Sequence, residues 1–213
     1  MSDQDRVIET IREAFGSNEY PGDPFLQGSF EGCEPADSVG PFVGQEDWET
    51  VDPEVLDGAG ALNFFPEAAF RFYMPAYMIA DLREQLVRED PTFHLTHAFH
   101  EISVEVPTES GTFVRKTGRS EFVNPRRYGA MTWNDHGRNR LSIFSREEAQ
   151  AIVAYLKYRR ASDPDGLNHA SIDAALDEYW LDRASNAPSR DDLKTHVDEE
   201  ERFMRSINPD FDS

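Results

Sequence analysis

Three histidines recur at every third position in the middle of the chain, as His94-x-x-His97-x-x-His100. Imidazole is a common zinc ligand, and three such ligands would leave a fourth position for water, the arrangement of a zinc hydrolase. On one helix, however, residues i, i+3 and i+6 spread over about 120°, so only adjacent pairs converge easily. No accompanying motif, such as H-E-x-x-H with its glutamate base, is present. We therefore favour ordinary surface or core histidines, and keep a small metal-dependent hydrolase as an alternative.

A second group of residues with possible chemistry lies between positions 115 and 140, where seven basic residues accompany two acidic ones and aromatic residues are interleaved. Arginines and aromatics on a small sheet can bind phosphates and stack on bases, which would make an anion or nucleic-acid binder. We favour a contact with carboxylates, of this chain or of a protein partner, because a net charge of −20 opposes the approach of nucleic acid. The candidate partner-binding residues are Arg115, Arg119, Arg126, Arg127, Tyr128, Trp133 and Arg138.

Other catalytic signatures do not occur in the sequence. It contains no glycine-rich phosphate loop, no G-x-S-x-G turn and no C-x-x-C pair. Cys33 is the only cysteine, so an intramolecular disulfide is impossible and a reducing compartment is expected. We identify no catalytic residue, expect no cofactor, and leave open whether the protein is an enzyme.

Charge is distributed unevenly along the 213 residues. Residues 1–60 sum to −13, residues 61–160 to +2 and residues 161–213 to −9. Scarce lysine (three of 21 basic residues) and abundant carboxylates suit a salt-rich cytosol, although a genome that favours arginine codons would give the same composition. The acidic start does not resemble a signal peptide, and no apolar stretch approaches the length of a membrane span. We expect a soluble cytoplasmic protein of unknown oligomeric state.

Hydrophobic spacing predicts helices at both ends of a compact core. Residues 2–15 begin with a capping signal, Ser2 with Asp5, and residues 145–158 begin with another, Ser145 with Glu148. The apolar segment 61–88 predicts two short helices or one bent helix, since Pro75 removes a hydrogen bond. Ten glycines and prolines over residues 16–45 predict a long loop without regular elements. Residues 161–213 form an acidic helical end.

Alternating apolar and polar residues predict strands over residues 100–144. Strands from 100 to 106, and over 112–116, 119–124, 129–134 and 140–144, are separated by turn signals such as Asn134-Asp135-His136-Gly137. The predicted class is therefore α+β, with helices on one face of a small antiparallel β-meander at about residues 100–144. We expect a single domain over residues 1–213, with its compact core at about 46–160.

Two stretches of the chain together resemble a known family. Trp48 is followed by LNFFPEAAFRFYMPAYM over residues 62–78, and LSIFS at residues 141–145 leads into the closing helix 145–158. The pair is similar to a family of uncharacterised microbial proteins classed as a domain of unknown function. The likeness covers residues 48–80 and 140–160, and implies no activity.

The leading functional hypothesis is a non-enzymatic protein-binding domain that uses the basic sheet and the long loop. A metal-dependent hydrolase and an anion or nucleic-acid binder through residues 115–140 are the alternatives.

Overall fold

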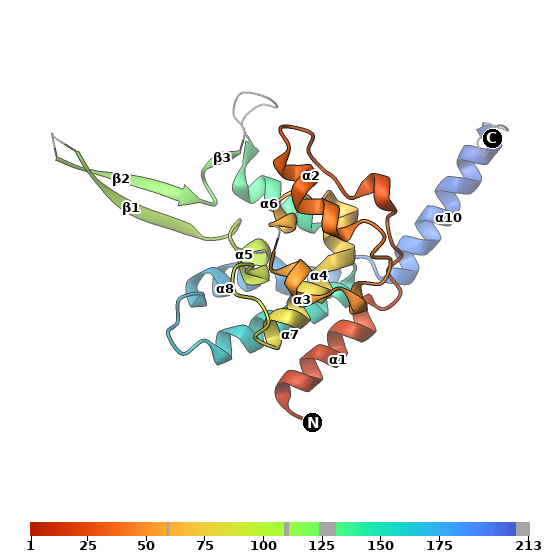
Figure 1. The fold of residues 1–213 in the computed structure, drawn as a ribbon, viewed down its shortest axis with the longest axis horizontal. Helices are drawn as coiled ribbons and strands as arrows, with labels where there is room; N and C mark the ends of the chain where they lie inside the picture. The colour runs from red at the N-terminus through yellow and green to blue at the C-terminus, as the bar shows by residue number, and fades with distance from the viewer. Residues whose placement is uncertain (59, 109–110, 124–130, 208–213) are drawn as a thin grey trace.

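The computed structural model describes residues 1–58, 60–108, 111–123 and 131–207. Figure 1 shows a helical body from which a two-stranded ribbon of β1 (Glu101–Thr108) and β2 (Gly111–Gly118) projects on one side, while the last helix, α10 (Arg190–Ile207), extends on the other. The chain thus has the predicted α+β class, with helices in the majority. No helix in these residues combines the length and the hydropathy needed to cross a lipid bilayer.

The centre of the body is α4 (Glu67–Leu82), in which twelve of sixteen residues are buried. Pro75 lies inside this single helix, so residues 67–82 form one helix, while the start of the predicted segment forms the separate turn η4 (Ala61–Asn63). The helix ends before position 88, because Arg83 leaves the helical conformation and Glu84 adopts a positive φ of 58°. α4 is therefore the core element around which the other helices pack.

Two helices with capping boxes flank α4. In α1 (Asp3–Phe15) and α7 (Arg146–Ser162), the capping side chains are Ser2 with Asp5 and Ser145 with Glu148, as predicted. α7 lies against both α1 and α9 (Leu181–Asn186). These contacts bring the two ends of the chain together on one core.

The segment predicted as a loop without regular elements does contain helical turns, so that prediction is wrong. Pro35 stands near the start of α2, where its missing N–H costs nothing, and Leu26, Val39 and Phe42 are buried against the core. The remaining helical segments are η1 (Asp23–Phe25), α2 (Glu34–Val39), η2 (Gly40–Phe42), η3 (Trp48–Thr50), α3 (Pro53–Leu56), η4 (Ala61–Asn63), α5 (Pro91–Thr96), α8 (His169–Ala175), the π-helical turn η5 (Leu176–Trp180) and α10 (Arg190–Ile207).

The described strands form two separate two-stranded antiparallel sheets in place of one meander. β1 (Glu101–Thr108) pairs with β2 (Gly111–Gly118), and the short β3 (Phe122–Val123) pairs with β4 (Met131–Thr132). The strand predicted at 140–144 is wrong, because Trp133–Leu141 form helix α6. The Thr132 hydroxyl and the Asp135 carboxylate make a capping box that starts this helix where the sequence suggested a turn.

One hydrophobic cluster runs from Ile8 to Trp180. It includes buried residues of α1, of the 16–45 segment and of α8–η5 as well as of the predicted core at 46–160. Ile172 and Trp180, both fully buried, anchor the start of the acidic end, and the Trp180 indole N–H donates to the carbonyl of Leu95 at 2.9 Å. The segment after α7 is therefore part of the packed body up to η5.

Candidate functional site

A cavity of about 770 Å³, here called the histidine pocket, opens where the ribbon joins the body. Its walls come from α5, α6, the start of α8 with the segment before it, and the inner ends of β1 and β2. The lining residues are Asn63, Phe93, His94, Thr96, His97, His100, Ile102, Thr117, Gly118, Glu121, Trp133, His136, Gly137, Arg140, Leu141, Leu167, Asn168, Ala170 and Ser171. The volume lies within the range of small-molecule sites.

All three histidines of the repeated motif line the pocket. His94 lies in α5, His97 is its C-cap, and the ring centroids of the two are 6.5 Å apart with nearly perpendicular planes. His100 lies just before β1 and also lines the cavity. Among the described residues, no group of three or more histidine, cysteine or acidic side chains is arranged to hold a metal ion. The histidines thus share a pocket without forming a ligand set.

The hydrogen bond of His97 fixes which ring nitrogen carries its proton. Nδ1 lies 2.9 Å from the carbonyl oxygen of Phe93, which can only accept, so Nδ1 donates and the neutral ring leaves Nε2 as an acceptor. The same ring stacks on Phe93, with centroids 4.5 Å apart and planes 13° from parallel. Trp133 meets it edge-on at 5.1 Å.

Burial lowers the pKa of His94, His97 and His136 and so favours their neutral forms near pH 7. Burial, followed by the charge of Arg140, lowers the pKa of His94 to about 3. Burial is also the main cause that lowers the pKa of His97, although its bond to Phe93 opposes the shift. The pKa of His136 is lowered as well, by burial and then by Arg140.

Helix α6 supplies the cationic side chain of the pocket. Arg140 Nη2 donates to the carbonyl oxygens of Leu62 at 2.7 Å and Phe65 at 3.2 Å, and its Cζ lies 4.2 Å from the centre of the Phe70 ring. Burial lowers the pKa of Arg140 to about 10, which leaves the guanidinium charged at neutral pH, and the charge of Glu67 opposes that shift. Arg140 takes part in none of the ion pairs between described residues.

Sequence reasoning missed His136 and Arg140 as pocket residues. Residues 134–137 read as a turn, and 140–144 as a strand, so the two side chains were not expected on one helical element. The local signal that could have found them is Thr132-x-x-Asp135, the capping box of α6. His136 and Arg140 follow at helical i, i+4 spacing and line the same cavity.

The predicted partner-binding residues lie in three different settings. Arg115 pairs with Glu121 at 2.7 Å, and Arg119 pairs with Glu178 of η5 at 2.5 Å. Arg138 donates to the Glu178 carbonyl at 3.1 Å and lies over the rings of Phe99 and Tyr179. Trp133 lines the histidine pocket. The other three predicted residues, Arg126, Arg127 and Tyr128, lie outside the described residues.

The ribbon β1–β2 exposes an apolar face. The register pairs Val104 with Arg115 and Val106 with Phe113, so alternate residues of both strands share one side. Its apolar members are exposed: Ile102 by 52%, Val104 by 44%, Val106 by 38% and Phe113 by 60%. We call this side the apolar ribbon face; it consists of Ile102, Val104, Val106, Phe113, Arg115 and Thr117.

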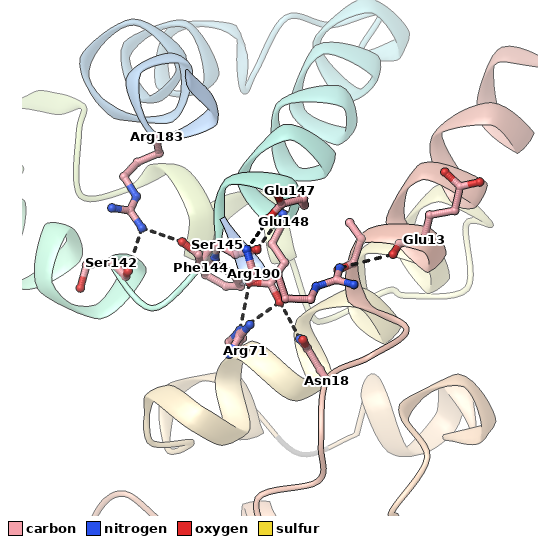
Figure 2. Close-up of polar contacts among 11 residues, drawn as sticks. Glu13, Asn18, Arg71, Ser142, Phe144, Ser145, Glu147, Glu148, Arg183 and Arg190 are labelled. Atoms are coloured by element: carbon pink, nitrogen blue, oxygen red, sulfur yellow. Dashed lines mark hydrogen bonds and ion pairs between the residues drawn. The ribbon is translucent and has the colours of Figure 1, made fainter. Parts of the chain in front are cut away.

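A second polar cluster lies inside the body and has a structural role. Figure 2 shows Glu148 at its centre, on α7, with Arg71 of α4 and Asn18 after α1 pointing toward it. Arg190, at the start of α10, donates to the carbonyl oxygen of Ala14, and Arg183 of α9 donates to the carbonyl oxygen of Phe144 at 2.6 Å. These arginines tie late helices to the ends of early elements.

Comparison with known proteins identifies the family but no activity. No curated protein and no solved structure matches the chain. Residues 3–184 match the family described as "Family of unknown function (DUF6714)". This range includes the ribbon, the histidine pocket and the core from α1 to η5. Because the match covers most of the chain, the protein belongs to this family of unknown function.

Proposed function

We propose that this protein is a binding protein that docks an extended, acidic segment of a partner polypeptide along the β1–β2 ribbon. The observation that carries the proposal is the apolar ribbon face, which projects from the body into solvent (Figure 1). An isolated two-stranded ribbon is only marginally stable in water. A third strand added at an edge would extend the sheet and place its own apolar side chains beside those of the apolar ribbon face, which removes part of that face from water.

The two edges of the ribbon differ as docking sites. β1 contains Pro107, and a proline fits a strand only where its nitrogen faces away from the neighbouring strand, so the outer edge of β1 lacks a donor there. β2 has no proline, and within the described residues no further strand pairs with its outer edge. Its unpaired N–H and C=O groups can accept a strand by the same ladder that joins β1 to β2.

The charges along β2 favour an acidic segment. Arg115 and Lys116 are 59% and 64% exposed, and each already pairs with a carboxylate, Glu121 and Glu101 respectively, at 2.7 Å. Exposed ion pairs contribute only about 0–1 kcal/mol, so an incoming carboxylate can share or replace these partners. A second copy of the chain is disfavoured as the occupant, since two molecules of net charge −20 repel one another.

Site-specific photo-cross-linking tests this proposal. A benzophenone amino acid at Phe113 stands on the apolar ribbon face, and the same group at the adjacent Thr112 stands on the opposite face. In extracts of the cells that make the protein, we expect the Phe113 probe, and not the Thr112 probe, to cross-link one defined protein. The cross-linked peptide should be an extended segment with alternating apolar and acidic residues.

A synthetic peptide of that segment then provides the quantitative test. Val104→Thr together with Phe113→Ser should weaken its binding at least tenfold, whereas Ser103→Ala on the opposite face should leave binding unchanged. Equal cross-linking from both positions, a product that is only a dimer of this chain, or a cross-linked segment without acidic residues would overturn the proposal.

A further inference from the structure

We propose that the histidine pocket binds a small, planar aromatic monocarboxylate that also carries a hydroxyl or N–H donor. The ligand-recognising groups of this site lie on α6 and at the end of α5, while Ile102 and Thr117 of the apolar ribbon face line the mouth of the same cavity. Three features of the pocket select this class of ligand: its flat walls, the guanidinium of Arg140, which has no ion-pair partner among the described residues, and the acceptor nitrogen of His97.

The walls of the pocket suit a flat ring. Phe93 and His97 stack in nearly parallel planes, and the Trp133 ring stands edge-on to His97 at 5.1 Å and to His136 at 5.4 Å. Leu141 and Leu167 add aliphatic surface. Aromatic rings favour stacked and edge-to-face neighbours with centroids about 4.5–7 Å apart, so an added ring continues the geometry already present.

Arg140 provides one positive charge in a fixed position. Only Nη2 donates hydrogen bonds to described residues, and both acceptors are backbone carbonyls. These uncharged groups hold the guanidinium in place without neutralising it. Nη1 therefore remains available to donate to a ligand, and a carboxylate is the acceptor that matches a guanidinium best. A single charge fits a monoanion better than a dianionic phosphate.

Three of the four histidines that line the cavity add no charge to this balance. His94, His97 and His136 are neutral at pH 7, because burial and the charge of Arg140 lower the pKa of each. Among the described lining residues, Glu121 is the only carboxylate, and it already pairs with Arg115 at 2.7 Å. Arg140 is therefore the one arginine or lysine among the described lining residues, and Glu67, outside the lining, acts on it by its charge.

His97 selects a ligand that can donate a hydrogen bond. Its Nδ1–H is committed to the Phe93 carbonyl, so Nε2 can only accept as long as the ring is neutral. A hydroxyl or N–H group on the ligand can donate to this acceptor. A second carboxylate would instead place its negative oxygens against the lone pair of Nε2 and be repelled. The ligand thus carries its negative charge at one end and a donor at another.

Calorimetric titration with matched compounds tests the class without altering the protein. The probes are 4-hydroxybenzoate, indole-3-carboxylate, the neutral isostere 4-hydroxybenzyl alcohol, and adenosine 5′-monophosphate as a dianionic alternative. We expect at least one carboxylate to bind with a dissociation constant below 1 mM, and 4-hydroxybenzyl alcohol to bind at least tenfold more weakly than 4-hydroxybenzoate. Failure of both carboxylates at 10 mM, equal binding of acid and alcohol, or tighter binding of the nucleotide would overturn the proposal.

Two variants locate the binding in the pocket. Arg140→Gln should abolish the preference for the acid over the alcohol, and His97→Phe should weaken 4-hydroxybenzoate about tenfold while affecting benzoate less. Arg83→Gln, at an exposed arginine that does not line the cavity, serves as the matched control. Circular dichroism verifies the fold of each variant. If Arg140→Gln fails to fold, the acid–alcohol comparison in the His97→Phe variant still tests the site. A compound that bound elsewhere on the protein would bind this variant and the wild type with the same affinity.

Discussion

Glu148 combines a local and a long-range role in one fully buried side chain. Within its own helix it accepts from the backbone N–H of Ser145 at 2.7 Å and completes the capping box. Across the core it accepts from Arg71 Nε at 2.9 Å and from the side-chain amide of Asn18 at 2.7 Å. A buried carboxylate is tolerated only when its hydrogen bonds are made in this way.

Replacing Glu148 should therefore destabilise the protein strongly. Glu148→Ala leaves Arg71 and Asn18 without their partner, and breaking a buried pair costs about 3–5 kcal/mol. Urea unfolding at pH 7 measures the loss in the free energy of unfolding. The control is Glu9→Gln, at an exposed carboxylate 3.9 Å from Arg12, which should change that free energy by less than about 0.5 kcal/mol. A loss below about 1 kcal/mol for Glu148→Ala would contradict the role assigned to this residue.

His94 should make stability depend on pH. Its pKa is about 3 in the folded protein, lowered by burial and by the charges of Arg140 and His97, against an ordinary value of 6.5. Between these values the unfolded chain binds a proton that the folded chain does not, so the free energy of unfolding falls as pH decreases from about 6.5 toward 3. The full contribution is present above pH 6.5.

Chemical unfolding at pH 7, 6 and 5 isolates this contribution. His94→Gln should flatten the pH dependence by up to about 1 kcal/mol per pH unit, the order expected for one proton. The exposed His196 of α10 provides the matched substitution, His196→Gln. Parallel pH profiles for His94→Gln and the wild type would show that His94 titrates alike in the folded and unfolded chains.

At the level of elements, a close contact places α6 against the end of α5. A Cβ atom at Gly137 would lie 2.3 Å from the Cβ of Ala98, so the absence of a side chain at 137 lets the helix approach. The Asn134 amide donates to the carbonyl of Ala98 at 3.1 Å beside this contact. Both contacts hold Arg140 and His136 over the pocket that α5 lines from the other side.

Gly137→Ala should consequently lower stability despite the better helix propensity of alanine. Overpacking costs about 1–3 kcal/mol, which outweighs a gain of at most about 1 kcal/mol from propensity. Thermal unfolding compares the variant with the wild type. Adding Ala98→Gly to Gly137→Ala should restore part of the loss; a fully stable single variant would exclude the contact as a constraint.

For the whole molecule, the net charge of −20 is the dominant electrostatic feature. Several carboxylates form ion pairs within the chain. Glu178 pairs with Arg119, Asp173 with Arg160 and Asp81 with Arg159. The remaining acids still outnumber the bases, and such an excess weakens the compact state by self-repulsion. Salt reduces that repulsion, since the Debye length falls from about 10 Å at 0.1 M to about 3 Å at 1 M.

The melting temperature at pH 7.5 should therefore rise as KCl increases from 0.02 to 1 M, most steeply over the first few hundred millimolar. At pH 5, close to the sequence pI of about 4.5, the same salt series should give a smaller rise, because net charge is smaller. Differential scanning calorimetry measures both series. A salt effect of equal size at the two pH values would indicate a general solvent effect and not relief of self-repulsion.

The sequence by itself determined the features that depend on neighbours three or four residues apart. The capping boxes of α1 and α7, the apolar stripe of α4 and the alternation of β1 and β2 all follow from such spacing. These features suffice for the α+β class, and the resemblance carried by residues 62–78 pointed to a family of unknown function. The helix α6 was missed because turn-forming residues at 134–137 obscured the capping box beside them.

Only the tertiary structure decided which distant side chains meet. Arg140 is held by carbonyl groups 78 and 75 residues earlier in the chain, and Arg119 meets Glu178 59 residues later. The histidine motif gave no sign that His136 and Trp133 would close the same cavity. Such contacts arise from how buried faces pack together, which depends on the shape of the whole core and leaves no fixed spacing in the sequence.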